Sequence, residues 1–448
     1  MLSDTICAIA TASGGALGIV RLSGPKSFEI VDRFFHPANG TPISQVPQNT
    51  IHYGHVYDCE GNEIDDVMVS KFKAPHSFTG EDSIEISCHG SKYILAKIIE
   101  ELIRRGCRQA SPGEFTKRAF LNGKMDLSQA EAVADIISAE SKATHDVALS
   151  QMRGEFSSAL SKLREKLLHV TSLLELELDF SEEDVEFADR KELISLVDEI
   201  KRRIENLIKS YDTGKALKEG IPVAIIGKTN VGKSTILNRL LHDDKAIVSD
   251  IHGTTRDTIE DVSNIHGVDF RFIDTAGLRQ TDDKVETIGI ERTYKTISLA
   301  RIVLWVVDEE PIPQEYAEIT TLSKDKTLLL VHNKSDLKPL SITSSVPMMN
   351  ISAQYDATIE PLEDFIFDHA NLQTYNDVII TNSRHYEALL RALESIARVM
   401  EGLTIQNPGD IIAEDLRDTL HILAEITGGE IQSSEVLNSI FSNFCIGK

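Results

Sequence analysis

One short segment, residues 227–234, constrains the fold of this chain more than any other. Its sequence, GKTNVGKS, follows an apolar run at 223–226 and precedes a stretch with helical spacing. The glycines allow the backbone to curl so that its N–H groups surround an anion, and the start of the helix favours the same negative charge. The segment therefore predicts a phosphate-binding loop, in which Lys233 should reach the β- and γ-phosphates of a nucleotide and Ser234 should hold Mg²⁺.

Apolar runs alternate with helical stretches around this loop, from residue 221 to about residue 367. Such alternation is typical of a mostly parallel sheet covered by helices. We therefore predict an α/β domain with strands at residues 223–226, 270–273, 302–307, 328–331 and 348–351.

Three more motifs follow the loop in chain order. DTAG at 274–277 ends one predicted strand, where its aspartate can meet the water shell of a metal ion. NKSD at 333–336 ends another, and the Asp336 carboxylate can accept both the N1–H and the N2–H₂ of guanine, donors that adenine lacks. SAQ at 352–354 fits the loop that supports the base. Together these motifs predict a Ras-like GTP-binding domain.

The residue that follows DTAG, Leu278, bears on hydrolysis. Many GTPases have a glutamine there that orients the attacking water, which leucine cannot do. Another group must take this role, and spacing does not choose among the candidates in the following loop, which are Glu286, Asp282, Asp283 and Gln280. GTTRD at 253–257 should supply a threonine to Mg²⁺, and its Arg256 is either an arginine finger or an ordinary ion-pair residue.

The rest of the chain has a different pattern. Residues 1–118 contain strand-like runs and one helical stretch, which predicts a small α/β domain. Residues 119–215 and 376–448 have helical spacing without strand signals. Because the ends of an inserted domain lie close together, we predict one all-α helical domain that is split by the GTP-binding domain at 216–375. The strand-like runs are at 6–10, 17–22, 65–72 and 83–87, and the helical stretch is at 92–105.

Composition excludes several classes of protein. The 448 residues include 46 Lys and Arg against 70 Asp and Glu, a formal net charge of −24, so the chain does not coat nucleic acid by charge alone. Contact with RNA would need local patches, such as Arg104, Arg105 and Arg108 with 117–118, or 201–203. Such clusters are more often solvated helix faces.

Cysteine usage and hydropathy indicate the compartment. Five cysteines without a CxxC pair make a disulfide framework or a zinc ribbon improbable. No apolar run approaches the roughly 18 residues of a membrane span, and the N-terminus lacks a basic segment. We expect a cytoplasmic, reduced, multidomain protein.

Motifs outside the GTP-binding domain complete a recognisable pattern. They are GIVRLSG at 18–24, FTGED at 78–82, PGEFTKRAFLNGK at 112–124, DLSQAEA at 126–132, LDF at 178–180 and FCIGK at 444–448. With these motifs the chain resembles, from end to end, the MnmE (TrmE) family of tRNA modification GTPases.

The resemblance implies an N-terminal domain that binds a tetrahydrofolate derivative (5-formyl- or 5,10-methylene-tetrahydrofolate) and that forms the contact of a homodimer. The implied folate site is Arg21, Glu85, Lys124 and Lys448. Arginine and lysine suit the glutamyl carboxylate of a folate, and glutamate suits the donors of its pterin ring. Glu81 remains a competitor for the place of Glu85.

The resemblance also implies G domains that dimerise across the nucleotide and use K⁺ where other GTPases use an arginine finger. The implied K⁺ ligands are Asn230, Ser249, Ile251 and Thr254; Ser234 and Thr255 would bind Mg²⁺, and Glu286 would position the water. The full set of implied GTP contacts is Asn230, Val231, Gly232, Lys233, Ser234, Thr235, Ser249, Asp250, Ile251, His252, Gly253, Thr254, Thr255, Asp274, Thr275, Ala276, Gly277, Asn333, Lys334, Asp336, Ser352, Ala353 and Gln354.

The family reaction adds an aminomethyl-type group at C5 of the tRNA wobble uridine. It requires a flavin- and NADH-dependent partner, MnmG (GidA), in a heterotetramer or larger complex. Two alternatives remain open at this stage: a ribosome-assembly or regulatory switch GTPase without one-carbon chemistry, and a folate-dependent aminomethyltransferase whose G domain is only regulatory. Cys445 is as consistent with a packed tail as with a nucleophile.

Overall fold

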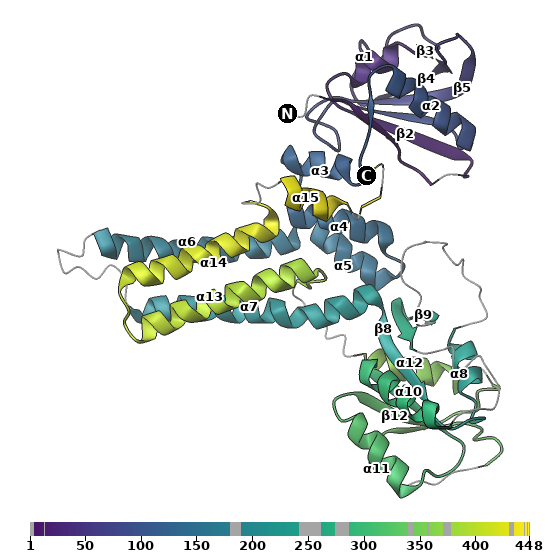
Figure 1. Ribbon diagram of the computed structural model, residues 1–448, viewed down its shortest axis with the longest axis vertical. Coiled ribbons are helices and arrows are strands. Elements are labelled where there is room, and N and C mark those ends of the chain that lie inside the picture. Colours follow the sequence, from purple (N-terminus) through teal and green to yellow (C-terminus); the bar gives the residue numbers. More distant parts are fainter. Residues whose placement is uncertain are drawn as a thin grey trace. The chain divides into compact units, whose positions relative to one another are not determined.

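The computed structural model describes residues 4–12, 14–179, 190–241, 261–273, 286–338, 344–355, 358–370, 378–429, 434–442, 444–445 and 447. The chain forms two compact units (Figure 1). One consists of Met1–Ser138, Leu149–Asp198 and Glu394–Lys448, and the other of Ala139–Ala148 and Glu199–Leu393. Each unit includes parts of more than one predicted domain, so the boundaries at 118, 215 and 375 stay predictions.

The first unit contains a seven-stranded sheet. Its strands lie in the order β3 (Phe35–Pro37), β4 (Thr50–Tyr57), β5 (Glu63–Phe72), β6 (Ser83–His89), β2 (Leu17–Ser23), β1 (Ile6–Ile9) and β7 (Arg108–Gln109). All neighbours are antiparallel except β1 and β7. The strands predicted in this domain are confirmed. β4 was not predicted, because histidines and a glycine interrupt its apolar pattern.

The two faces of this sheet differ. Helices α1 (Ser27–Asp32) and α2 (Lys92–Arg104) pack on one face, where buried Val20, Val69 and Ile86 alternate with outward-facing neighbours. The opposite face leaves large apolar side chains exposed, at Leu17, Ile51, Tyr53 and Met68. The period of two along each strand produces this division.

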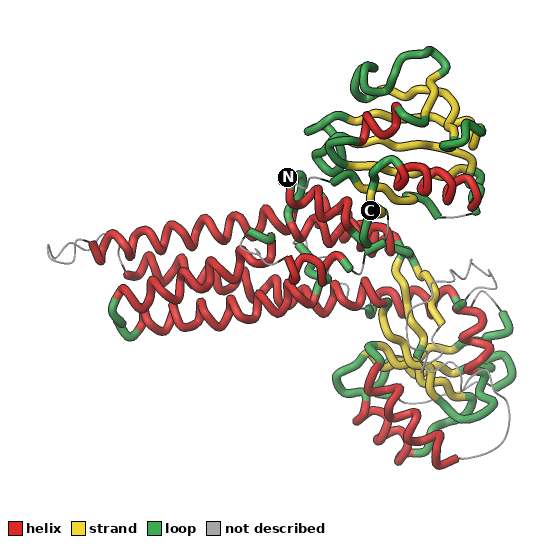
Figure 2. Tube along the Cα trace, turned by 45° about the horizontal axis from the view of Figure 1, so that its top comes forward, coloured by secondary structure: helices red, strands yellow, loops and turns green. Residues whose placement is uncertain are grey.

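Helices from both ends of the chain pack together in the first unit. Helix α6 (Glu155–Asp179) packs along α14 (Gly409–Thr427) (Figure 2). Arg417 of α14 contacts Glu175 of α6 at 2.8 Å. The shorter helices α3 (Glu114–Leu121), α4 (Leu127–Ser138) and α15 (Ser434–Phe441) form a second apolar cluster. This packing agrees with a helical domain built from two separate segments.

Three helices have residues in both units. They are α5 (Lys142–Met152), α7 (Arg190–Glu219) and α13 (Ser383–Thr404). In the second unit, Tyr211 of α7 stacks on Tyr386 of α13 with ring centroids 4.3 Å apart. The segments that precede and follow the inserted domain therefore lie side by side.

The second unit contains a six-stranded sheet in the order β13 (Met348–Asn350), β12 (Thr327–His332), β11 (Ile302–Val307), β8 (Ile221–Ile226), β10 (Val268–Phe272) and β9 (Asp261–Ile265). All pairs are parallel except β9 with β10. The five predicted strands are confirmed. β9 was not predicted, because only alternate positions of DVSNI are buried.

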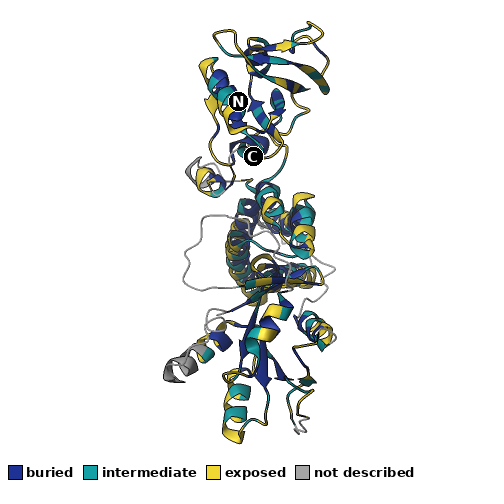
Figure 3. Cartoon of the chain, turned by 90° about the vertical axis from the view of Figure 1, so that its right-hand side faces the viewer, coloured by how far each residue is buried: buried dark blue, intermediate teal, exposed yellow. Residues whose placement is uncertain are grey.

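Helices cover both faces of this sheet, so its central strands are buried throughout (Figure 3). Val223 and Ile225 pack towards α8 (Lys233–Leu240) and α12 (Glu360–Asp368). Ala224 and Ile226 pack towards α10 (Glu286–Leu299) and α11 (Pro313–Leu322). Burial on both faces explains the continuous apolar runs in the sequence. Among the described residues, no helix has the length and apolar content to cross a membrane.

Candidate functional site

The predicted phosphate-binding loop connects β8 to α8, and its backbone requires glycine. Gly227 and Gly232 have φ angles of 141° and 96°. A Cβ on Gly227 would lie 2.2 Å from the Val306 carbonyl oxygen, and one on Gly232 would lie 2.1 Å from Asn333 Nδ2. The loop is therefore held close to the neighbouring strands, with its amides at the start of α8, as an anion site requires.

Lys233 lies in the first turn of α8 and faces the loop. Its Nζ donates hydrogen bonds to the carbonyl oxygens of Gly227 at 2.8 Å and Lys228 at 2.5 Å. Burial lowers the pKa of Lys233. These acceptors are neutral, whereas a phosphate oxygen would bring the full negative charge that a desolvated ammonium favours. The residues present therefore fit a bound polyphosphate.

The NKSD and SAQ motifs meet the phosphate loop at the carboxyl ends of β8, β12 and β13. The buried side chain of Asn333 donates to the Val231 carbonyl at 2.8 Å and accepts the Ala353 N–H at 3.0 Å. Lys334 Nζ donates to the Asn230 carbonyl at 2.7 Å. This edge of a parallel sheet is where nucleotides bind in α/β folds.

Some of the remaining residues predicted to contact the nucleotide are described by the structure, and others are not. Asp336, Gln354 and Thr235 are exposed, and Ser352 is buried. Ser234 is half-buried in the first turn of α8, where its hydroxyl suits Mg²⁺. Other predicted positions lie outside the described residues: Ser249, Asp250, Ile251, His252, Gly253, Thr254, Thr255, Asp274, Thr275, Ala276, Gly277, Gln280, Asp282, Asp283 and Lys448. Glu286 begins α10, but its side chain is not among the described ones.

Two carboxylates near the loop were missed by the sequence analysis. Asp308 Oδ2 contacts Lys334 Nζ at 2.7 Å, and Glu315 contacts Lys228 at 3.3 Å. Asp308 directly follows β11 at the same edge of the sheet, which is the signal that could have identified it.

A second group of predicted residues assembles on the exposed face of the seven-stranded sheet. Arg21 of β2 lies directly opposite Glu85 of β6, with Arg21 Nη2 2.8 Å from Glu85 Oε1. Arg21 Nη1 also donates to the Gly447 carbonyl at 3.4 Å. The rings of Phe78 and Phe115 lie 5.6 and 5.7 Å from the Arg21 guanidinium carbon. Sequence reasoning missed both phenylalanines.

Of the other two predicted folate residues, the structure describes Lys124, while Lys448 lies outside the described residues. Lys124 is exposed and donates from Nζ to the Pro75 carbonyl at 3.0 Å. Glu81 pairs with Arg118 at 3.1 Å, so Glu85 is the partner of Arg21 in the structure. Gly447 has a φ of 95°, and a Cβ there would lie 2.2 Å from the Ile9 carbonyl oxygen. Gly447 therefore lies close against Ile9, the last residue of β1.

The basic cluster considered for RNA is neutralised by carboxylates. Arg104 pairs with Glu100, and Arg105 pairs with Glu101. Arg108 lies 2.8 Å from Asp4 and 2.5 Å from Glu114. These ion pairs favour a structural role over an RNA site, but Arg105 is only 14% exposed and pairs with the fully buried Glu101, so it is not part of a solvated helix face as predicted. All five cysteines are free thiols.

Two family models match nearly the whole chain. The model of the GTP-binding protein TrmE N-terminus matches residues 5–124. The model of the MnmE helical domain matches residues 127–445.

Full-length relatives agree with the family models. The chain is 52% identical over 470 residues to the tRNA modification GTPase MnmE of Bacteroides thetaiotaomicron and 53% identical over 470 residues to that of Bacteroides fragilis, with 100% of each chain covered. It is 49% identical over 474 residues to the tRNA modification GTPase MnmE of Christiangramia forsetii, again with full coverage of both. The chain belongs to the MnmE family of tRNA modification GTPases.

Proposed function

We propose that this GTPase of tRNA modification acts on C5 of the wobble uridine. It would add a (carboxymethyl)aminomethyl-type group to tRNA together with a flavin-dependent partner of the MnmG (GidA) type, in a heterotetramer or larger complex. The observation that carries the proposal is the presence, in one chain, of the phosphate loop joined to NKSD and of the Arg21–Glu85 pair beside the C-terminal tail. A switch GTPase would need only the first of these two sites.

The Arg21–Glu85 pair has side chains suited to a folate site. Arg21 and Glu85 have side chains that are 21% and 27% exposed, so both are partly desolvated yet accessible. Glu85 suits the N–H donors of a pterin ring, and Arg21, which contacts Glu85 at 2.8 Å, would donate to the pterin carbonyl at the same end of the ligand. Lys124 and Lys448 would add positive charge for the carboxylates. When bound, the tetrahydrofolate derivative supplies the one-carbon unit.

The nucleotide site would promote hydrolysis mainly by electrostatic stabilisation of the phosphates by groups that are already in place. The loop amides and Lys233 stabilise the phosphates, Ser234 and Thr255 hold Mg²⁺, and Asp336 selects guanine. Asn230, with Ser249, Ile251 and Thr254, would hold a K⁺ ion when G domains dimerise, and that ion would add positive charge at the phosphates. Because Leu278 has no amide, we assign the attacking water to Glu286.

A homodimer is the proposed assembly. Leu17, Ile51, Tyr53 and Met68 are between 49% and 70% exposed on one face of the N-terminal sheet. A concentration of exposed apolar side chains favours an interface, and the same surface on a second copy is the commonest partner.

The proposed location is the cytoplasm, where tRNA and GTP are both available.

Mass spectrometry of tRNA nucleosides tests the proposal. Cells that lack the gene should lose the modified wobble uridine, and wild-type protein should restore it. Lys233→Ala should not restore it, because the phosphates lose their main cation. An unchanged nucleoside profile in the deletion strain would contradict the proposal and favour a regulatory switch GTPase.

A further inference from the structure

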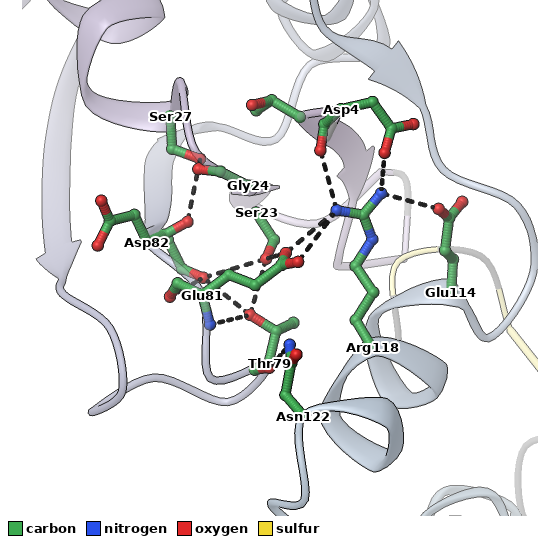
Figure 4. Close-up of polar contacts among 12 residues, drawn as sticks. Asp4, Ser23, Gly24, Ser27, Thr79, Glu81, Asp82, Glu114, Arg118 and Asn122 are labelled. Atoms are coloured by element: carbon green, nitrogen blue, oxygen red, sulfur yellow. Dashed lines mark hydrogen bonds and ion pairs between the residues drawn. The ribbon is translucent and has the colours of Figure 1, made fainter. Parts of the chain in front are cut away.

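The guanidinium of Arg118 lies fully buried at the centre of a polar network (Figure 4). Its Nη2 donates to Asp4 Oδ1 at 2.8 Å and to Glu114 Oε1 at 3.1 Å, and its Nη1 donates to Glu81 Oε2 at 3.1 Å. Arg108 contacts Asp4 and Glu114 from the other side. A buried charge is stable only when it is paired in this way. Arg118 therefore fixes the relative positions of three chain segments.

One of these segments, residues 77–82, is held at several points. Glu81 accepts a second hydrogen bond from Ser23 Oγ at 2.7 Å. Asn122, just after α3, donates from Nδ2 to the Thr79 carbonyl at 2.8 Å. The backbone on the C-terminal side of Phe78 is therefore tied both to the sheet and to the end of α3.

Phe78 presents its ring to solvent from this segment. It is 40% exposed, and its ring centroid lies 5.6 Å from the guanidinium carbon of Arg21. The buried ring of Phe115, in α3, lies 5.7 Å from the same atom. An exposed ring beside a guanidinium offers a surface on which a flat heteroaromatic ligand can stack.

We propose that Phe78 contacts the pterin ring of the folate, and that Arg118 acts through Glu81 as the positioning residue that holds Phe78 in place. The inference rests on the proposed folate site at Arg21 and Glu85. It explains why FTGED and PGEFTKRAFLNGK, which lie outside the nucleotide site, are joined by a buried ion pair.

The test measures binding of 5-formyl-tetrahydrofolate to the full-length protein by calorimetry. Phe78→Leu removes the ring and should weaken binding roughly tenfold, whereas Phe78→Tyr keeps the ring and should bind within about twofold of wild type. Tyr93→Leu changes another exposed aromatic residue, in α2, and is the matched control that should bind as wild type does.

Glu81→Gln tests the positioning role. Arg118 keeps its pairs with Asp4 and Glu114, so the variant should fold, and folate affinity should fall about three- to tenfold. Glu100→Gln removes a carboxylate that pairs with Arg104 on the surface of α2 and should leave the affinity unchanged. If Glu81 acts through Phe78, Glu81→Gln should cause no further loss in the Phe78→Leu background.

The outcomes separate this inference from the folate site itself. Equal affinities of Phe78→Leu and Tyr93→Leu, or of Glu81→Gln and Glu100→Gln, would overturn the inference and leave the site at Arg21 standing. If the losses of folate affinity multiply in the Phe78→Leu/Glu81→Gln double variant, Glu81 does not act through Phe78 and the positioning role is wrong. If Glu81→Gln does not fold, Asn122→Ala replaces it, because it removes the hydrogen bond from Asn122 to the Thr79 carbonyl. Its folate affinity is then compared in the wild-type and Phe78→Leu backgrounds. Failure of the wild-type protein to bind 5-formyl-tetrahydrofolate would overturn both the folate site and the inference.

Discussion

The side chain of Asn333 donates a hydrogen bond to the Val231 carbonyl across 2.8 Å, which ties the base-recognition motif to the phosphate loop. Its other side-chain atom, Oδ1, accepts the N–H of Ala353. One buried amide thus joins three motifs that are far apart in the sequence. The nucleotide site is a single hydrogen-bonded body rather than three independent loops.

Asn333→Ala should therefore weaken both stability and nucleotide binding. The variant leaves a buried carbonyl and a buried N–H without partners, which costs about 1–3 kcal/mol. Urea unfolding and GTP titration would measure the two effects. Asn264→Ala is the control and should cost less, because the two hydrogen bonds that it removes, one to Asp269 and one from the Gly267 N–H, are exposed. Equal stability of the two variants would contradict the role assigned to Asn333.

Gly232→Ala should abolish tight GTP binding. The added Cβ would collide with Asn333 Nδ2 at 2.1 Å, in a backbone conformation that already disfavours alanine. We expect GTP affinity to fall at least about tenfold. Gly61→Ala is a matched control, because Gly61 also has a positive φ, of 84°, but a Cβ there meets nothing within 4 Å. Its GTP affinity should equal that of wild type.

GTP turnover should depend on K⁺. If Asn230 and its neighbours place K⁺ beside the phosphates, replacement of K⁺ by Na⁺ at equal ionic strength should lower turnover at least about tenfold. Phosphate release under saturating Mg²⁺ and GTP measures this directly. Equal rates in the two salts would rule out the K⁺ site.

The Arg118 network should make the first unit sensitive to acid. Burial raises the pKa of Asp4 and Glu114, but hydrogen bonds from Arg108 and Arg118 outweigh it and hold both pKa values below the usual range. A lowered pKa contributes stability at higher pH, and that stability is lost as pH falls through the folded-state pKa. The melting midpoint should therefore fall as the pH drops below the ordinary pKa of these carboxyl groups, about 4.

Glu114→Gln should reduce this dependence, because it removes one of the titrating groups. Glu60→Gln, at an exposed turn, should keep the wild-type slope. A slope in Glu114→Gln as steep as that of wild type would show that other carboxylates control acid unfolding.

The nucleotide domain could be predicted from the sequence because the features that define it, its apolar strands and its glycine-containing loop, are local in the chain. Strands such as β11, buried on both faces, produce continuous apolar runs, and the glycines of the phosphate loop mark the turn. β9 escaped prediction because its alternation is short and partly polar. Asp308 directly follows β11, which marks it as a possible site residue, but its partner Lys334 lies 26 residues further along the chain, so the pairing itself could not be predicted.

The N-terminal site was less predictable. The pairing of Arg21 with Glu85 depends on the register of β2 against β6, which spans 64 residues of chain. The contact of Arg21 with Gly447 spans 426 residues. No local period encodes such contacts. The resemblance to a family supplied Arg21 and Glu85, but the positions of Phe78, in the segment before β6, and of Phe115, in α3, beside Arg21 are known only from the structure.

The central claim is tested most directly by reconstitution. Purified protein, an MnmG-type partner with its flavin, unmodified tRNA, GTP, K⁺ and a tetrahydrofolate one-carbon donor would be incubated, and the tRNA nucleosides analysed by mass spectrometry. We predict that a C5-modified wobble uridine forms, and that omission of this chain, GTP or the folate prevents it. Formation of the same nucleoside without this chain, or no formation in the complete mixture, would contradict the account.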